Sequence, residues 1–550
     1  MKLVVPIFRR DLHINFVLKA VLKASENPFN NSTIEEVGKM LVLNFLLAML
    51  PIIWLMFALT ALKMPGFKAC GIAALIAAIL APLYWKQPIP YTAAAALEGI
   101  LNALWPICLV IIAALFTYQL TLETGAMEDI KQMLAGISKD GRIMVLIVGW
   151  AFGHFMEGMA GFGTAVAIPA GILVALGFDP FRTIVACLVV NAMPTAYGSV
   201  GVPTVTLGTV TGIDPLVLSP NVALIECLLF LISPFVMVII FGGGVKALKG
   251  MVGITLAASL SFVIPEFLTG MFIGPQLPDI IGAVICMGCL IFLARARKDA
   301  PVPAEYEATT SGNQRELSGG DAFRAWSPFI LILIFLLVAT LVPAVHDPLS
   351  AIKTSVQIYP EEGASKLTFA WVNTPGVLIF IAAFIGGLIQ KASIGTMGKV
   401  LKRTLVSNWK TVFTICCVVA CAKIMDHSGM TSDISALLAQ TGSFFPLVSP
   451  LIGVLGAFIT GSGTSTCVLF GGMQAMTATR IGADPAWLAA ANVMGAGIGK
   501  MISPQSIAIG LAAVGMPGKE SEILSRVMKY CVLYTVIAGL VCYFMPVFLH

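Results

Sequence analysis

Charged residues are scarce in this chain. Asp, Glu, Lys and Arg make up 11% of its 550 residues, whereas an average soluble domain carries about 25%. Histidine is scarcer still, with five residues, and no nucleophile–base pair or metal-ligand constellation stands out. We therefore expect no enzymatic activity, no metal and no cofactor. A nucleotide-binding motif and a soluble domain of useful size are also missing, which argues against an ATP-driven machine and a nucleic-acid partner.

The twelve cysteines do not indicate disulfides or a metal site, because nearly all lie in apolar segments. Cys286 and Cys289 form a C-x-x-C pattern, but no histidine or further cysteine stands at ligand spacing. Residues 1–37 are polar and mixed, without the uninterrupted apolar region that is typical of a cleaved signal peptide.

Hydrophobic residues, by contrast, make up 58% of the chain. They gather in runs of about 20 residues, long enough for a helix to cross a hydrocarbon core about 30 Å thick. This pattern predicts an all-α, multi-pass membrane protein with about 12 transmembrane helices, embedded in the lipids of the plasma (inner) membrane. We place these helices near residues 40–62, 69–85, 92–120, 184–208, 221–243, 251–268, 279–295, 325–345, 374–391, 404–425, 486–510 and 526–548.

The chain also resembles itself at an offset of about 300 residues. TGAMEDIKQMLA, from Thr124, matches SGMTSDISALLA, from Ser428, and GFGT from Gly161 matches GSGT from Gly461. Four further pairs follow in the same order: Asn191 with Asn492, Met193 with Met494, Gly198 with Gly499 and Pro203 with Pro504. We therefore predict two structural repeats, in residues 40–245 and 325–550.

Positive charge indicates that the two repeats face opposite sides of the membrane. Residues 126–142 carry three Lys or Arg residues, whereas the matching residues 430–446 carry none. The bias reverses upstream, where the segment before Trp105 has one such residue and the segment before Trp409 has four. This reversal predicts inverted repeats, a plan common in secondary transporters, with 126–142 cytoplasmic and 430–446 external.

Two segments, 142–178 and 447–483, are too broken by glycine to cross the bilayer as simple helices. We interpret each as a re-entrant hairpin whose tip is the G-x-G-T motif. Residues 246–295 form a connecting helix pair, and the polar linker 296–324 should be cytoplasmic, which puts both termini outside. Residues 1–39 carry six positive charges on that side, so either they form a polar, interfacial segment or the count of spans is off by one.

Irregular backbone within a membrane needs protein or water to satisfy its polar groups, and the sequence has four such places. Two are the hairpin tips, 157–164 and 460–466, and two are helix breaks, 191–203 and 492–506. Helices that restart there offer free N–H groups and a positive dipole end, which suit a carboxylate. The alternative is close helix packing through small residues. The predicted substrate-binding residues are Gly161, Gly163, Thr164, Asn191, Ser462, Thr464, Ser465, Thr466, Asn492, Lys500, Ser503, Gln505 and Ser506.

Lys500 lies in GAGIGKMISPQS, which resembles a phosphate-binding loop only superficially, because Met501 follows the lysine instead of Ser or Thr. It lies about 20 Å into its predicted span, too deep for its stem to reach the membrane surface. Its match in the first repeat is Ser199, whereas Glu157 matches Ala457, so one repeat supplies a base and the other an acid. We predict that Lys500 binds substrate or takes part in coupling; the alternative is a structural ion pair.

Three ionisable residues in apolar surroundings are candidates for carrying a proton: Glu157, His154 and Glu226. For Glu157 the alternative is a cap at the hairpin tip, and for His154 it is packing. Three other polar residues lie together at the outer end of a span and are expected to form a solvated cluster: Lys423, Asp426 and His427.

Several motifs give the chain a more specific resemblance. FMEGMAGFGTAVAI, VTGIDP, GPQLPDI, RAWSPF, GAFITGSGTS and GKMISPQSIAI, the last followed by AAVGMPGKES, are similar to those of the L-lactate permease family. The resemblance extends from about residue 45 to residue 535. The second tip departs from the family's usual GSDTSSN, with Gly463 and Cys467 in place of Asp and Asn.

This resemblance implies a proton symporter of short 2-hydroxy-monocarboxylates, such as L-lactate, D-lactate or glycolate. It also implies an elevator, in which a domain that bears the hairpins moves against a scaffold. The partners would be a small carboxylate anion and a co-transported proton, and a homodimer is one assembly to consider. Two alternatives stay open: a sodium- or proton-coupled carrier of another small organic anion, such as a dicarboxylate, and an anion channel.

Overall fold

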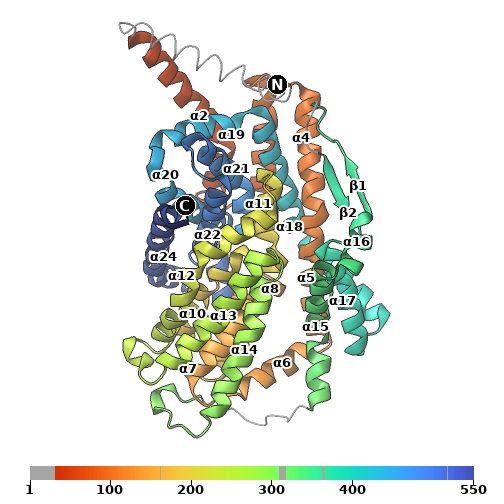
Figure 1. Ribbon diagram of the computed structural model, residues 1–550, viewed down its shortest axis with the longest axis vertical. Helices are drawn as coiled ribbons and strands as arrows, with labels where there is room; N and C mark the ends of the chain where they lie inside the picture. The colour runs from red at the N-terminus through yellow and green to blue at the C-terminus, as the bar shows by residue number, and fades with distance from the viewer. Residues whose placement is uncertain (1–30, 162, 309–317, 362–365, 517, 550) are drawn as a thin grey trace.

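A computed structural model describes residues 31–161, 163–308, 318–361, 366–516 and 518–549 of the protein. In these residues the chain is helical apart from one short β-hairpin (Figure 1). The expected all-helical membrane architecture is therefore confirmed. The predicted segment 1–39 lies mostly outside the described residues, and its part from residue 31 onward already belongs to the first described helix.

The first half of the described chain forms helices broken at several points. Its elements are α2 (Asn31–Thr60), α3 (Gly66–Leu83), α4 (Ile89–Asn102), η2 (Ala103–Cys108), α5 (Leu109–Glu123), α6 (Ala126–Ala135), α7 (Gly141–Met144), η3 (Val145–Phe152), α8 (Gly153–Met159), α9 (Thr164–Ala175), α10 (Pro180–Val190), η4 (Met193–Ala196), α11 (Gly198–Thr211) and α12 (Pro215–Phe241).

A helix pair and the second half of the chain follow. These elements are η5 (Val245–Leu248), α13 (Val252–Phe272), α14 (Pro278–Ala296), η6 (Ala304–Tyr306), α15 (Gly319–Leu341), α16 (Pro343–Ala351), β1 (Lys353–Val356), β2 (Leu367–Ala370), α17 (Pro375–Ile389), α18 (Ile394–Ser428), α19 (Met430–Leu438), η7 (Ala439–Phe444), α20 (Phe445–Thr460), α21 (Gly463–Ile481), α22 (Pro485–Lys500), α23 (Pro504–Ala513) and α24 (Glu520–Leu549).

Ten helical segments of the described chain are long and apolar enough to cross a membrane, fewer than the 12 predicted. Two predicted spans, 184–208 and 486–510, are each divided, because prolines and left-handed backbone end one helix and start another. A third, 374–391, is a helix of only 15 residues. Conversely, one of the ten segments, Met430–Thr460, was not predicted as a span; it contains the first arm of the second predicted hairpin.

The helices form two groups, which Figure 1 shows on opposite sides of the view. In one group α18 packs on α3, α4 and α5, and α17 packs on α5 and α15. In the other, α12, α13 and α14 pack in sequence, and α22 packs on α12, α20 and α21. The groups meet where α18 contacts α21 and α5 contacts α11.

The two segments that were predicted to be re-entrant hairpins each form a pair of packed helices. In the first, α8 and η3 pack on α9, and in the second α20 packs on α21. The two halves of the chain interlock around them, because α21 packs on α11 and α23 packs on α9. Each hairpin therefore contacts a broken helix from the other half of the chain.

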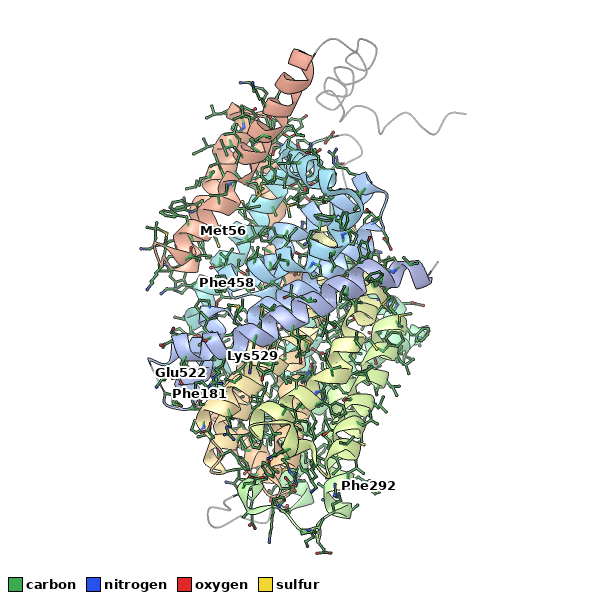
Figure 2. The ribbon with its side chains drawn as sticks, turned by 90° about the vertical axis from the view of Figure 1, so that its left-hand side faces the viewer. Met56, Phe181, Phe292, Phe458, Glu522 and Lys529 are labelled. Atoms are coloured by element: carbon green, nitrogen blue, oxygen red, sulfur yellow. The ribbon has the colours of Figure 1, made fainter. Side chains whose placement is uncertain are left out.

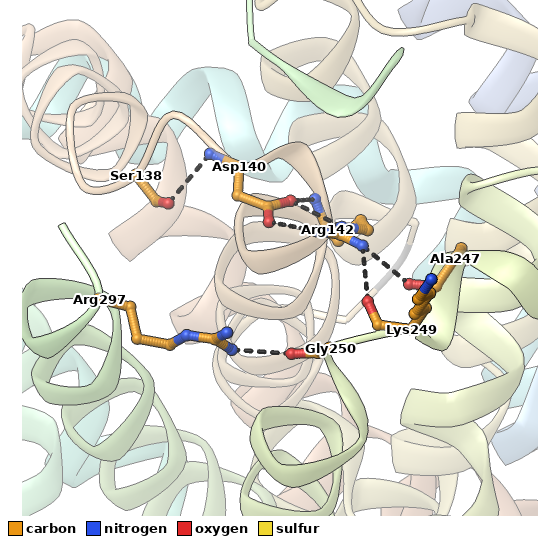
Figure 3. A network of polar contacts seen from close by, with 7 residues as sticks. All are labelled: Ser138, Asp140, Arg142, Ala247, Lys249, Gly250 and Arg297. Carbon is orange, nitrogen blue, oxygen red and sulfur yellow. Dashed lines mark hydrogen bonds and ion pairs between the residues drawn. The ribbon is translucent and has the colours of Figure 1, made fainter. Parts of the chain in front are cut away.

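Arg142 lies in a network of polar contacts that joins residues 138–142 to residues 247–250 (Figure 3). Arg142 donates hydrogen bonds to the carbonyl oxygens of Ala247 and Lys249, both at 3.2 Å, and pairs with Asp140 at 2.8 Å. The linker joins this network, since the amide of Ala308 donates to the carbonyl of Lys139 at 2.8 Å. Residues 139–142 and the linker thus lie at the same end of the molecule, and their cytoplasmic location stays a prediction.

The outer surface of the helices is apolar, as expected of a lipid-facing surface. Met56 on α2 and Phe292 on α14, both labelled in Figure 2, are 39% and 71% exposed. A β-hairpin of β1 and β2, which the sequence pattern did not predict, lies beside α4 (Figure 1). It is held there by the indole of Trp105, which donates to the carbonyl of Ala370 at 3.1 Å.

Candidate functional site

A cavity of about 320 Å³ lies where the four irregular segments meet. This volume is at the lower end of the range of small-molecule sites. All four predicted places contribute to its wall, so segments far apart in the sequence converge on one site. The lining residues from these places are Glu157, Gly163, Thr195, Gly198, Ser199, Val202, Pro203, Thr460, Gly461, Ser462, Gly463, Thr464, Ser465, Lys500, Gln505 and Ser506, and Ile509 of α23, just beyond the last of these places, lines the cavity as well.

Four helices of the irregular segments begin at this cavity, and α3 begins there as well. For each of the four, a residue just before the helix or in its first turn belongs to the lining: Gly163 before α9, Gly198 of α11, Gly463 of α21 and Gln505 of α23. Ser462 and Ser503 cap the last two helices, because their hydroxyls accept hydrogen bonds from the amides of Ser465 and Ser506, both at 3.2 Å. Because a helix N-terminus carries a partial positive charge and free N–H groups, the wall favours an anion.

The first glycine of each tip packs against the helix break of its own repeat. Gly161 and Gly461 have left-handed backbones, with φ of 61° and 67°. A Cβ at Gly161 would overlap the hydroxyl of Ser199, and one at Gly461 would overlap the side-chain amide of Gln505. Ser199 also donates a hydrogen bond to the carbonyl of Ala160 at 3.0 Å. Each tip is thereby fastened to the break that follows it in sequence.

The second glycine of each tip faces the other repeat: Gly163 faces α23, which follows the second break, and Gly463 faces the first break. A Cβ at Gly163 would lie 2.8 Å from Cδ1 of Ile509, and one at Gly463 would lie 2.6 Å from Cγ2 of Thr195. The close contact between Gly463 and Thr195 is a physical reason for glycine at a position where the family usually has Asp, because a longer side chain would displace Thr195. Each tip therefore contacts its own repeat through its first glycine and the other repeat through its second.

Lys500 and Glu157 form a buried ion pair at this junction. Nζ of Lys500, the last residue of α22, donates to Oε1 of Glu157 on α8. The residues are 7% and 3% exposed, and the second carboxylate oxygen of Glu157 has no hydrogen-bond partner among the described residues. Gly198 makes room for the pair, because a Cβ there would lie 2.9 Å from Oε1 of Glu157. The cavity thus contains one buried acid whose charge the buried base balances.

The glycines before Lys500 do not break the helix, contrary to the prediction. Gly495, Gly497 and Gly499 all lie within α22, which continues to Lys500, and the break is confined to residues 501–503. A Cβ on Gly495 or Gly499 would overlap the backbone of α20, and one on Gly497 would overlap the backbone before η4. These glycines serve close helix packing, which was the alternative interpretation.

The predicted binding residues divide into two sets. Gly163, Ser462, Thr464, Ser465, Lys500, Gln505 and Ser506 line the cavity. The others lie behind its wall: the hydroxyls of Thr164 and Thr466 donate to the carbonyls of Gly161 and Ser462, both at 2.8 Å. Asn492 accepts a hydrogen bond from Gln474 at 2.9 Å. Gly161, Asn191 and Ser503 complete this set, and Ser503 positions the start of α23.

His154 lies outside the cavity, in an aromatic environment. It is 1% exposed, and its Nδ1 donates to the carbonyl of Trp150 at 2.7 Å. Its ring centroid lies 4.0 Å from that of Trp150 and 4.6 Å from that of Phe262. These contacts fit the packing interpretation of this histidine.

Glu226 belongs to a group of buried acids that includes two residues not singled out from the sequence. Glu226 on α12, Glu266 on α13 and Asp279 on α14 are each at most 1% exposed, and no oxygen of the three carboxyls has a hydrogen-bond partner among the described residues. Asp279 interacts electrostatically with Glu266, Glu157 and Lys500. Glu266 and Asp279 could have been found by the signal that identified Glu226, a lone acid in an apolar span.

The remaining wall of the cavity comes from α3, α5 and α18, which the sequence analysis did not assign to the site. Its residues are Pro65, Gly66, Phe67, Ile111, Lys410, Thr411, Thr414 and Ile415. Lys410, like Lys500, is a lysine inside a predicted span, and that signal could have identified it. The cavity therefore lies between the two groups of helices.

The cluster expected to be solvated is instead largely buried. Glu98 on α4, 5% exposed, accepts from Lys423 at 3.0 Å and faces Nε2 of His427 at 3.1 Å. The sequence analysis missed this partner because Glu98 precedes Lys423 by more than 300 residues. The prediction was wrong for Lys423 and His427, which join α18 to α4.

The chain is similar to known proteins over most of its length. Residues 44–549 match the family described as L-lactate permease. An L-lactate permease of Streptococcus iniae is 41% identical over 452 residues, which cover 81% of this chain and 93% of that protein. A glycolate permease of Escherichia coli is 34% identical over 545 residues, covering 91% of this chain and 95% of that protein.

Among solved structures, the YdaH transporter of Alcanivorax borkumensis aligns with 78% of this chain and 84% of its own, with a TM-score of 0.43 and 14% identity. The relatives named above and the ten apolar segments make this chain a multi-pass integral membrane protein, which in a bacterium resides in the plasma membrane. Because the family match and the relatives both extend over most of its length, the chain belongs to the L-lactate permease family.

Proposed function

We propose that the protein is a proton symporter that takes short 2-hydroxy-monocarboxylates, such as lactate or glycolate, across the membrane. The observation that carries this proposal is the cavity between the helix groups, where several helices begin and where the buried Lys500 is held by Glu157. The names of the relatives, L-lactate permease and glycolate permease, favour the same class of substrate.

Anion recognition follows from the wall of the cavity. The substrate carboxylate binds Lys500 and the free N–H groups at the starts of α21 and α23. The hydroxyls of Ser462, Thr464 and Ser465 and the amide of Gln505 are neutral groups within the same wall. They are available to the 2-hydroxyl group, which both donates and accepts hydrogen bonds.

Proton coupling follows from competition for Lys500. A substrate carboxylate that pairs with Lys500 displaces Glu157, whose carboxylate is then left buried without a counter-charge. Because an uncompensated buried charge costs several kcal/mol, Glu157 takes up a proton as the anion binds. One proton enters with one anion, which cancels the electrical cost of moving an anion against an inside-negative potential, about 2.3 kcal/mol per 100 mV.

Translocation is proposed to occur by an elevator built on two inverted repeats. The group with α7–α14 and α20–α24 carries both hairpins, both breaks and the Glu157–Lys500 pair, whereas the group with α3–α5 and α18 forms the opposite wall. Movement of the first group against the second would carry the bound substrate from one side to the other.

The test is uptake of labelled carboxylates by proteoliposomes that contain the purified protein. Lactate and glycolate should accumulate when the outside is more acidic than the inside, saturate with concentration, and stop accumulating when a protonophore is added. Accumulation that follows a sodium gradient, or that favours dicarboxylates, would replace the proposal with its carrier alternative. Flux that neither saturates nor responds to the pH gradient would indicate a channel.

A further inference from the structure

Lys410 is a second cationic residue in the wall of the cavity. It lies opposite the group of helices that carries both hairpins (α7–α14 and α20–α24), which we call the hairpin group. It is on α18, which packs on α3, α4 and α5, whereas Lys500 is on α22 of the other group. The side chain of Lys410 is exposed, unlike that of Lys500. The two lysines therefore line one cavity from the two different groups of helices, Lys410 in contact with water and Lys500 buried.

The charges of the two lysines are balanced differently. Lys500 is neutralised by Glu157, whereas no carboxylate of the described residues lies within ion-pair distance of Lys410. Its nearest aromatic neighbours are Phe67, whose ring centroid is 5.5 Å from Nζ, and Trp409, whose centroid is 5.9 Å away. These rings orient the ammonium group without cancelling its charge.

The ionisable lining residues of the cavity are Glu157, Lys410 and Lys500. When all three are ionised, two positive charges and one negative charge give a net charge of +1. Because Glu157 neutralises Lys500, the remaining positive charge is that of Lys410. An empty cavity thus attracts an anion through Lys410, and a single negative charge compensates it.

We propose that Lys410 is the capture residue for the monoanionic substrate. The incoming carboxylate contacts Lys410 first, because Lys500 is occupied, and passes to Lys500 as Glu157 takes up its proton. This inference rests on the proposed function, and it assigns the first anion contact to the wall formed by α18. The match between one surplus positive charge and one carboxylate favours monocarboxylates over dicarboxylates.

The test is the initial rate of lactate uptake into proteoliposomes as a function of lactate concentration. Lys410→Met keeps an unbranched side chain of similar size but removes the charge. It should raise the half-saturating concentration roughly fivefold at low ionic strength, as for one charge pair in contact with water, with little change in maximal rate. At about 1 M salt, where the screening length is about 3 Å, the difference should largely disappear.

Three variants complete the experiment. Lys410→Arg should remain near wild type, and Lys410→Gln should repeat the effect of the methionine in case the latter folds poorly. Lys402→Met is the matched control, because Lys402 is also exposed on α18 but does not line the cavity. An unchanged half-saturating concentration in both neutral variants, or an equal increase in the control, would overturn the inference. Failure of the wild-type protein to take up lactate would instead overturn the proposed function.

Discussion

Replacing Lys500 by glutamine separates a binding role for the buried ion pair from a structural one. If Lys500 holds the substrate carboxylate, the variant loses a hydrogen bond to a charged group, which contributes about 1.5–3 kcal/mol. The dissociation constant for lactate should then rise on the order of 10- to 150-fold. Glu157, left without its partner, can stay protonated, so the variant should fold with a modest change in thermal stability.

Glu157→Gln should act in the opposite direction on binding. It removes the competitor for Lys500, so lactate binding should be as tight as in the wild type or tighter. It also removes the group that takes up the proton. If the wild type takes up one proton with each anion, as proposed, binding should tighten as the pH falls, by at most about tenfold per pH unit. In the variant this dependence should vanish, and exchange of internal for external lactate should survive while accumulation driven by a pH gradient is lost.

The assay is calorimetric titration of lactate into detergent-solubilised wild type, the two single variants and the double variant across a range of pH, with melting temperatures measured on the same samples. A structural pair would give a different pattern. Lys500→Gln would then bind lactate normally but lose stability, by about 3–5 kcal/mol for a broken buried pair, and the double variant would recover part of that loss. That result would refute the assignment of Lys500 to the substrate.

Two further predictions concern the membrane topology and the buried acids near the site. Single cysteines placed in 126–142 and in 430–446, in a background without reactive thiols, should be labelled from opposite sides of the membrane; labelling from the same side would end the inverted-repeat interpretation. Glu226→Gln, Glu266→Gln and Asp279→Asn should each leave the melting temperature nearly unchanged. A buried carboxyl without a counter-charge or hydrogen-bond partner is expected to be neutral, and an amide of similar size replaces it; a large decrease would show that the carboxyl is charged and paired. If Glu157→Gln accumulates lactate normally, the same three variants are the next to test for coupling.

The sequence was sufficient to place the candidate site because its signals are local. Glycine pairs at 161–163 and 461–463, and prolines at 203 and 504, interrupt apolar segments, and such interruptions within a membrane are typical of binding sites. Repetition of these signals at an offset of about 300 residues then indicated which segments belong together. The structure brings all four around one cavity.

The opposite wall could not be predicted in the same way. α5 and α18 are continuous helices where they line the cavity, α3 contributes only its first residues, and the small and hydroxyl-bearing residues on this wall are typical of any membrane helix. Similarly, whether a glycine ends a helix or admits a neighbouring backbone depends on what packs there. Gly499 lies in α22 because the backbone of α20 passes beside it, a contact that no local pattern encodes.

Charge balance links the ion pair to the proposed movement. Glu157 and Lys500 both belong to the hairpin group, whereas Lys410 lies on the opposite wall. With the cavity empty, the moving group carries a neutral pair; with one anion and one proton bound, it is neutral again. An anion bound without a proton would leave one unbalanced negative charge inside the moving group, at a cost of several kcal/mol. The same cost that holds the pair together in the empty cavity therefore opposes movement of the anion alone, so the coupling needs no separate gate.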